Sequence, residues 1–250
     1  MNGAGRGPAV ELRGVVKSFG GQPVLDRIDL ALDVGSTVAL MGTNGAGKST
    51  LLDLVCGLTH PGQGTVRVLG RRPRSAVRSG KVGAMVQSGG LLSDLTVRET
   101  LALFVRLFGD RVRTDELLDR VGLASLAQRR VALCSGGEQH RLRWAMAQAS
   151  APRLLVLDEP TAGMDWLARR EFWEQVAHLV GQGCTVLYSS HYADEVDEVA
   201  DRVLLLHDGR IVVDASPGQV RALVAGPGEG ALFDGLAAAL DGDAGGRGAR

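Results

Sequence analysis

A nine-residue glycine-rich segment constrains the fold of this 250-residue chain more than any other feature. It lies between two apolar stretches, 36–41 and 51–55, and reads Gly42-Thr43-Asn44-Gly45-Ala46-Gly47-Lys48-Ser49-Thr50. Such a loop between a strand and a helix directs backbone N–H groups and the positive end of the helix toward phosphate oxygens. Lys48 then neutralises the outer phosphates, and Ser49 can ligate Mg²⁺. An ordinary glycine-rich turn with an exposed lysine is the alternative, and the flanking strand and helix argue against it.

Two carboxylates follow another apolar stretch. Residues 154–157 are Leu-Leu-Val-Leu, and Asp158 and Glu159 come directly after them. An apolar run of this length is typical of a buried parallel strand, whose carboxyl end faces the ligand crevice of an α/β sheet. Asp158 is therefore expected to hold Mg²⁺ through water, and Glu159 to polarise the water that attacks the γ-phosphate. Acids after a strand more often make surface or capping contacts, and only the loop at 42–50 favours the catalytic interpretation.

The order of strand-like and helix-like stretches predicts one α/β domain. Strands are expected at 9–16, 24–32, 36–41, 64–69, 81–86, 154–157, 185–188, 203–206 and 211–213. Helices are expected at 51–55, 97–108, 114–121, 137–149, 168–180, 192–199 and 218–224. Strands that alternate with helices form parallel sheets with crossover connections. We therefore predict a domain at 1–225 with a mostly helical insert at about 88–150, and a Gly/Ala-rich tail at 226–250 that is partly disordered.

Composition narrows the classes of partner. Lys and Arg together number 28, as do Asp and Glu, so the formal net charge is +0 and no nucleic-acid partner is expected. No run approaches the roughly 20 apolar residues of a membrane helix, and the N-terminus lacks an apolar signal segment, so a cytosolic chain is expected. Cys56, Cys134 and Cys184 are spaced too widely for a disulfide framework or a cysteine zinc site.

A glycine pair precedes a second helical pattern. The segment Cys134-Ser135-Gly136-Gly137-Glu138 stands at its start, which places backbone N–H donors at a helix N-terminus and suggests a second anion site. This segment resembles the signature motif, usually written LSGGQ, of the ATP-binding cassette (ABC) family. The resemblance extends to Gln87 as the Q-loop glutamine, to 159–165 as the end of the Walker B motif and the D-loop, and to His191 as the switch histidine. It covers about residues 9–224.

This family resemblance implies a P-loop NTPase with a mostly parallel core sheet, an antiparallel N-terminal β-subdomain and a helical insert that bears the signature. It also implies a head-to-tail dimer in which the signature of one subunit closes over ATP on the phosphate loop of the other. The implied nucleotide-binding residues are Phe19, Gly42, Thr43, Asn44, Gly45, Ala46, Gly47, Lys48, Ser49, Thr50, Ser135, Gly136, Gly137 and Asp165. The implied catalytic residues are Lys48, Gln87, Glu159 and His191, and the implied metal residues are Ser49, Gln87 and Asp158.

Three of these roles depend most on the resemblance. Phe19 is expected to stack on adenine, although a core aromatic beside two glycines is the alternative, since stacking needs only a flat apolar face. Gln87 is implied to link magnesium to the transporter interface, and His191 to contact the γ-phosphate. A lone Gln or His after a strand is more often structural or solvated.

Three positions depart from the usual family pattern. Thr43 stands where many relatives have Pro, Cys134 where the signature begins with Leu, and Glu138 where Gln is usual. The first two remove no phosphate donor, and the third is a familiar variation. Catalysis at both sites of a dimer therefore remains chemically possible.

The complete motif set favours the ATPase subunit of an ABC transporter, which drives a separate membrane permease from the cytoplasmic face. Contact with the permease is expected through Gln87–Thr100 and the helical insert. The candidates for an apolar contact there are Leu91, Leu92 and Leu95, which are equally consistent with a role in the core of the insert. The subunit would pair with a second copy or with another ABC ATPase.

Two stretches resemble the sub-group that exports drugs, antibiotics or lipids. They are Ser189–Val196 and Asp94–Glu99. Import of other substrates stays open, because the permease carries most of the substrate specificity. The alternative from another class is a soluble ABC ATPase that works in iron–sulfur cluster assembly or as a nucleic-acid or ribosome clamp, although the neutral charge argues against a clamp.

Overall fold

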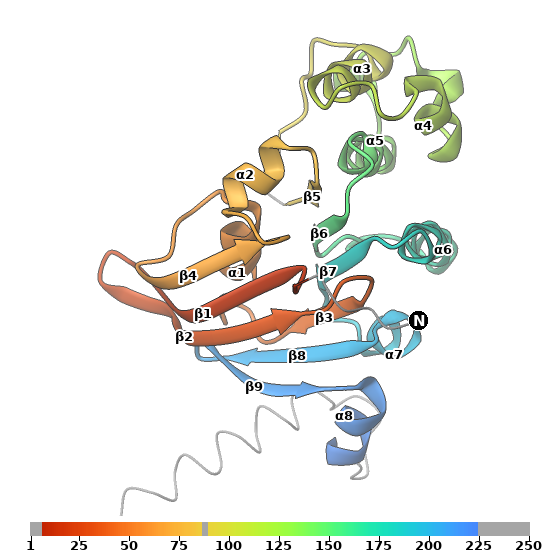
Figure 1. The fold of residues 1–250 in the computed structure, drawn as a ribbon. Helices are drawn as coiled ribbons and strands as arrows, with labels where there is room; N and C mark the ends of the chain where they lie inside the picture. Colours follow the sequence, from red (N-terminus) through yellow and green to blue (C-terminus); the bar gives the residue numbers. More distant parts are fainter. Residues whose placement is uncertain (1–6, 87–89, 225–250) are drawn as a thin grey trace, which may run out of the picture.

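The computed structural model describes residues 7–86 and 90–224. The predictions for Gln87 and for the tail at 226–250 therefore lie outside the described residues. Figure 1 shows two β-sheets and, at one end of them, the group of helices α3, α4 and α5.

A six-stranded sheet forms the centre of the fold. Its order is β5-β6-β7-β3-β8-β9, and all neighbours are parallel except β8 and β9. The strands are β3 (Thr37–Met41), β5 (Val82–Met85), β6 (Leu154–Asp158), β7 (Thr185–Ser189), β8 (Arg202–His207) and β9 (Arg210–Ala215). Because the carboxyl ends of parallel strands share one edge, the loops after β3, β6 and β7 open at the same place.

Alternate residues of the central strands pack on opposite faces of this sheet. Val38 and Leu40 join the apolar cluster around α1 (Lys48–Cys56), whereas Ala39 and Met41 join the cluster that contains α5 (Gly136–Gln148) and α6 (Trp166–Gly181). The strands β3, β6 and β7 are buried over their whole lengths. Burial on both faces explains why these strands are continuous apolar runs in the sequence.

A smaller antiparallel sheet covers the other side of α1. Its order is β2-β1-β4, and its strands are β1 (Val10–Phe19), β2 (Gln22–Leu32) and β4 (Gln63–Val68). The hairpin between β1 and β2 turns at Gly20 and Gly21, which have φ of 56° and 83°. Helix α1 lies between the two sheets, in contact with β6 of the larger one and with β2 and β4 of the smaller one (Figure 1).

The helical insert consists of α3 (Val97–Leu107), α4 (Thr114–Arg120), two 3₁₀ turns and α5. Helix α3 begins with a capping box, in which Thr96 Oγ1 accepts the N–H of Glu99 and the Glu99 carboxylate accepts the N–H of Thr96. Figure 1 shows α3, α4 and α5 grouped beyond the β5 end of the central sheet. The parallel sheet, the antiparallel sheet and the helical insert all agree with the predicted fold class.

Three short elements were not predicted. They are α2 (Pro73–Arg78) and the 3₁₀ turns Ala124–Leu126 and Val131–Leu133. In α2 only Ala76 is buried, so no apolar periodicity indicates a helix. Two further helices, α7 (Ala193–Val199) and α8 (Pro217–Val224), lie near their expected positions. No helix within 7–86 or 90–224 has the length and apolar character needed to cross a membrane.

Candidate functional site

The glycine-rich loop joins β3 to α1 at the carboxyl edge of the central sheet. Gly42, Gly45 and Gly47 have φ of 149°, 84° and 105°, a region that L side chains rarely adopt. A Cβ on Gly42 would lie 2.2 Å from the carbonyl oxygen of Leu206, and one on Gly47 would lie 2.9 Å from the carbonyl oxygen of Val24. Both backbone conformation and space therefore require glycine at 42 and 47.

Lys48 is the first residue of α1 and is only 8% exposed. Its Nζ donates to the carbonyl oxygens of Gly42 at 2.7 Å and Thr43 at 3.1 Å, so the ammonium is held against the loop. Burial lowers the pKa of Lys48, and the charges of Glu159 and Asp158 act in the opposite direction. A cation held at a helix N-terminus beside free backbone N–H groups is suited to bind phosphate.

Asp158 ends β6, and Ser189 lies beside it at the end of β7. Ser189 Oγ donates to Asp158 Oδ1 at 2.6 Å and accepts the N–H of Glu159 at 2.8 Å. The serine therefore fixes both the carboxylate and the backbone that follows it. The carboxylate of Asp158 accepts this one side-chain hydrogen bond at Oδ1 and has further lone pairs available to a ligand.

Glu159 and His191 lie close together on the two loops that follow β6 and β7. Glu159 Oε1 is 3.8 Å from His191 Nδ1, and both side chains reach solvent. The backbone of Glu159 has φ of 47°, a conformation that costs free energy for a residue other than glycine and that recurs at functional sites. The structure thus brings four predicted residues, Lys48, Asp158, Glu159 and His191, to one edge of the sheet.

Behind these loops lies a buried carboxylate that sequence reasoning missed. Glu195 in α7 is 2% exposed and accepts hydrogen bonds from Ser190 Oγ at 2.9 Å and from Thr161 Oγ1. Arg169 Nε lies 3.4 Å from Glu195 Oε1, and the guanidinium covers the ring of Tyr192 at 4.1 Å. Thr161 is in the loop after β6 and Ser190 is in the loop after β7. One carboxylate therefore joins the two loops that carry the candidate catalytic acid and histidine.

The signature residues begin α5. Ser135 Oγ accepts the N–H of Glu138 at 3.3 Å, and Glu138 Oε2 accepts the N–H of Ser135 at 2.7 Å. The hydrogen bond from the Ser135 N–H lowers the pKa of the Glu138 carboxyl. Ser135, Gly136 and Gly137 line a cavity of about 460 Å³ together with Asp165, whose Oδ1 caps α6. The signature and the D-loop therefore form one surface.

This surface is separate from the phosphate loop of the same chain. Within the described ranges, no hydrogen bond or ion pair joins residues 135–137 to residues 42–50. Large apolar side chains flank the signature and the D-loop and are exposed to solvent, namely Leu133, Trp166 and Leu167. Exposed apolar side chains gathered in this way are typical of a contact surface.

Phe19 ends β1 at the tip of the β1–β2 hairpin. Its side chain is 52% exposed, and Lys17 Nζ lies 4.6 Å from the ring centroid. The alternative of a core aromatic is therefore wrong. Farther along the hairpin, β2 contacts the phosphate loop, because Val24 and Leu25 lie against Gly47. A flat, accessible ring on the hairpin that supports the loop is consistent with stacking on a base.

The residues at this edge fit a magnesium ion that is shared with phosphates. Ser49 is exposed at the start of α1 and offers a hydroxyl oxygen, and Asp158 offers a carboxylate oxygen. These are the hard oxygen ligands that Mg²⁺ prefers, and this ion usually takes only one or two from the protein. In the part of the chain that the structure describes, no cluster of three or more His, Cys, Asp or Glu could hold a metal alone.

A phosphate loop after β3, paired acids after β6 and a histidine after β7, all on one parallel sheet, define the class of P-loop nucleotide-binding domains. Comparison with known proteins gives the family. A family model for the ABC transporter matches residues 25–162. The chain belongs to the ATP-binding subunits of the ABC transporter family. The predicted family is therefore confirmed, and its members are ATPases.

Two curated relatives are ATP-binding proteins of exporters. The Nod factor export ATP-binding protein I of Sinorhizobium fredii is 40% identical over 216 residues, which are 84% of this chain and 63% of the relative. The protein of the same name from Rhizobium johnstonii is 38% identical over 84% of this chain and 70% of the relative. The chain thus spans about two thirds of the length of these relatives.

Solved structures confirm the fold. An ATP-binding subunit of an ABC transporter has 26% identity and a TM-score of 0.79, and the match covers 86% of this chain and 92% of that one. A dimeric ATP-binding cassette in a post-hydrolysis state, bound to ADP and phosphate, has 24% identity and a TM-score of 0.76, with 83% and 98% covered.

Proposed function

We propose that this chain binds and hydrolyses ATP and so powers a separate membrane permease that exports its substrate. The observation that carries the proposal is the convergence of Lys48, Asp158, Glu159 and His191 at one edge of the central sheet. That set provides a phosphate-binding cation, a metal ligand, a carboxylate able to accept a proton, and a polar contact for the terminal phosphate.

Each side chain takes a distinct role in hydrolysis. The loop N–H groups and Lys48 bind the outer phosphates, and Lys48 exchanges its carbonyl contacts for phosphate oxygens. Glu159 orients the attacking water and accepts its proton, and His191 contacts the γ-phosphate from the other side. Ser189 holds Asp158 in place for the metal. Ser49, Gln87 and, through water, Asp158 would hold a Mg²⁺ ion, which would neutralise charge on the phosphates.

The signature belongs to a composite site between two subunits. Ser135, Gly136, Gly137 and Asp165 form one surface that makes no hydrogen bond to the chain's own phosphate loop across the described residues. A head-to-tail pair would bring this surface over the ATP of the facing subunit, whose adenine stacks on Phe19. The exposed apolar residues around the surface support an interface there. The partner is a second copy or another ABC ATPase.

The permease contacts the helical insert and the segment from Gln87 to Thr100. Leu92 is exposed there, as are Leu103 and Leu107 of α3, whereas Leu91 packs on the core. This contact would hold the chain at the cytoplasmic face of a membrane. The names of the relatives favour export, and a drug, antibiotic or lipid-like molecule is the proposed substrate class. A soluble ABC ATPase is the less favoured function, because these relatives act in export.

Steady-state ATP hydrolysis by three variants tests the proposed chemistry. Lys48→Ala should lose binding of a fluorescent ATP analogue, whereas Glu159→Gln should keep binding, lose turnover and accumulate a closed dimer in size-exclusion chromatography. The matched control is Glu174→Gln, which removes an exposed acid of α6 that pairs with Arg170 and should behave as the wild type. Normal turnover by Glu159→Gln would disprove the assigned base.

Copurification tests the transporter role. The tagged chain is recovered from detergent-solubilised membranes, and the copurifying chains are identified by mass spectrometry. A multispanning permease among them is the expected result. Recovery of soluble partners alone would overturn the permease proposal while leaving ATP hydrolysis untouched.

A further inference from the structure

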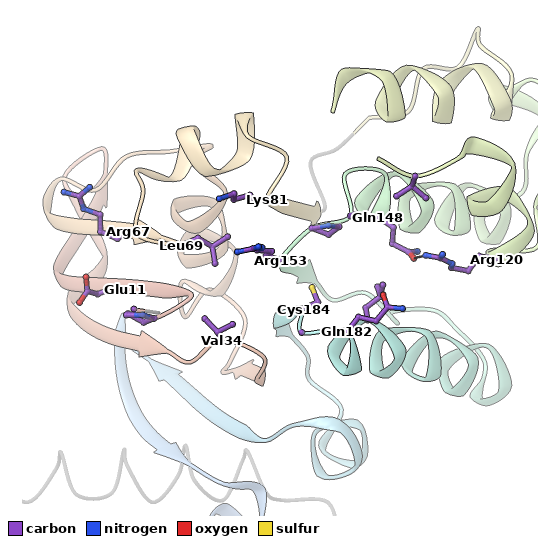
Figure 2. Close-up of a pocket in the computed structure, with 18 residues that line it drawn as sticks. Glu11, Val34, Arg67, Leu69, Lys81, Arg120, Gln148, Arg153, Gln182 and Cys184 are labelled. Atoms are coloured by element: carbon purple, nitrogen blue, oxygen red, sulfur yellow. Dashed lines mark hydrogen bonds between the residues drawn. The ribbon is translucent and has the colours of Figure 1, made fainter. Parts of the chain in front are cut away.

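A cavity of about 830 Å³ lies at the opposite edge of the central sheet from the phosphate loop. Lys81, Arg153 and Cys184 line it, and each directly precedes a parallel strand, β5, β6 or β7. The cavity therefore opens at the amino ends of strands whose carboxyl ends face the nucleotide edge. Figure 2 shows its side chains, and we name it the amino-edge cavity.

The amino-edge cavity has an excess of unpaired positive charge. Its charged residues are Arg67, Lys81, Arg120, Arg153 and a single acid, Glu11. That acid already forms an ion pair of 2.6 Å with an arginine outside the cavity. Among the described residues, none of the four cations has a carboxylate partner within ion-pair distance. In a chain of formal net charge +0, this is a local concentration of cations without counterions.

Further cations surround this cluster. The pKa of Lys81 is lowered most by the charge of Arg71, then by desolvation, and further by the charges of Arg153 and Arg111. An anion bound among these cations would reduce their mutual repulsion, because it would stabilise the charged form of each of them. The cavity is therefore electrostatically suited to a negatively charged ligand.

Backbone hydrogen bonds hold the main chain of two of the cationic residues beside each other. The Arg153 N–H donates to the Lys81 carbonyl oxygen at 2.9 Å, and the Thr185 N–H donates to the Arg153 carbonyl oxygen at 2.9 Å. Across the cavity, Arg120 of α4 donates to Gln148 of α5 at 3.1 Å. Figure 2 shows Lys81 and Arg153 on the strand side and Arg120 on the helical side. The main chain that carries Lys81 and Arg153 is thus held in place directly before β5 and β6, and Arg120 ends α4.

The remaining walls are largely apolar. Six side chains supply this surface, namely Pro8, Val34, Leu69, Val112, Pro152 and Leu179. The volume lies within the range of pockets that bind small organic molecules, about 300–1,000 Å³. An inorganic ion would leave these apolar walls and most of the space unused. We propose that the amino-edge cavity is a second ligand site, which binds an amphipathic organic anion: an apolar body that carries a phosphate, sulfonate or carboxylate group.

Two fluorescent probes with the same aromatic rings test the proposal. One is 8-anilinonaphthalene-1-sulfonate, which carries a negative charge, and the other is N-phenyl-1-naphthylamine, which carries none. Each is titrated into the full chain in the presence of saturating MgATP, so that the nucleotide edge is occupied. The double variant Lys81→Gln/Arg153→Gln removes two charges from the cavity. The matched control, Arg106→Gln/Arg170→Gln, removes two charges from exposed positions of α3 and α6.

The sulfonate should bind the wild type and the control within twofold of each other, and the cavity variant at least about tenfold more weakly. The uncharged probe should bind all three proteins alike. The proposal is overturned if the sulfonate does not bind the MgATP-saturated wild type, or if its affinity is equal in the cavity variant and the control. Equal weakening of both probes in the cavity variant would also overturn it, because the loss would then come from altered packing rather than from charge. Lys81→Gln alone, with thermal unfolding of every variant, checks that folding is retained.

Discussion

Replacement of Glu195 by alanine tests whether this buried carboxylate holds the loops after β6 and β7 together. The change leaves the hydroxyls of Thr161 and Ser190 and the side chain of Arg169 without their acceptor. Each buried hydroxyl that loses its partner costs about 1 kcal/mol or more, and removal of one member of a buried charge pair typically costs about 3–5 kcal/mol in all. Thr161 and Ser190 are at most 2% exposed, so water does not replace the lost contacts.

Urea and thermal unfolding measure this cost. A loss of about 4 kcal/mol corresponds to a fall of roughly 8–16 °C in Tm for a chain of this size. Glu195→Gln keeps one acceptor oxygen and should lose about half as much. In that variant kcat for ATP should fall while KM changes little, because Glu159 and His191 lose their relative position but the phosphate loop does not. The control is Glu198→Ala, an exposed acid of the same helix, with an expected change within about 0.5 kcal/mol. If Glu195→Ala lies within 1 kcal/mol of that control, the reasoning is refuted.

Three smaller perturbations examine other parts of the site. Gly42→Ala should weaken binding of a fluorescent ATP analogue at least about tenfold, because its Cβ would collide with the Leu206 carbonyl. Gly45→Ala should weaken binding less, because its Cβ would meet no atom within 4 Å. Equal effects of the two changes would contradict this account of the loop. Phe19→Ala should raise KM for ATP about three- to tenfold, because stacking on adenine is lost. Tm should not fall, because the ring is already exposed. An unchanged KM would show that Phe19 does not contact the adenine. The capping hydrogen bond lowers the pKa of Glu138, so its charge stabilises the fold above the ordinary pKa of a glutamate, and this stability is lost as pH falls through the lowered pKa. The Tm advantage of the wild type over Glu138→Gln should therefore be present at neutral pH and shrink on acidification, and a difference in Tm that does not change with pH would argue against it.

The fold was predictable because local pattern and tertiary position agree in most of this chain. The strands around 38–40, 154–157 and 186–188 are apolar throughout and are buried on both faces of one sheet. The loop at 42–50 was predictable for a related reason, since φ and space at Gly42 and Gly47 admit only glycine. Where the backbone conformation admits only one residue type, that residue in the sequence indicates the local structure.

Two features could not be read from the sequence for a physical reason. Helix α7 contains the acids Asp194, Glu195, Asp197 and Glu198, and nothing in that run indicates that Glu195 alone is buried. Its burial depends on hydroxyls at 161 and 190, which come from two other loops. The amino-edge cavity likewise depends on Lys81 and Arg153, which are 72 positions apart and become neighbours only through the pairing of β5 with β6. Pairings between distant segments leave no local pattern.

The residues at the end of β7 hold the acids after β6 and the histidine after β7 in fixed positions relative to each other. Ser189 binds Asp158 and the backbone of Glu159, whereas the next residue, Ser190, binds Glu195 and the N–H of Tyr192. Two adjacent serines thus attach the same short segment to the acids on one side and to α7 on the other, and His191 follows directly. A shift of the acids during hydrolysis must move Ser189, and Ser190 and Glu195 resist that movement. The position of His191 relative to the phosphate is therefore set jointly by β6 and α7, rather than by its own loop.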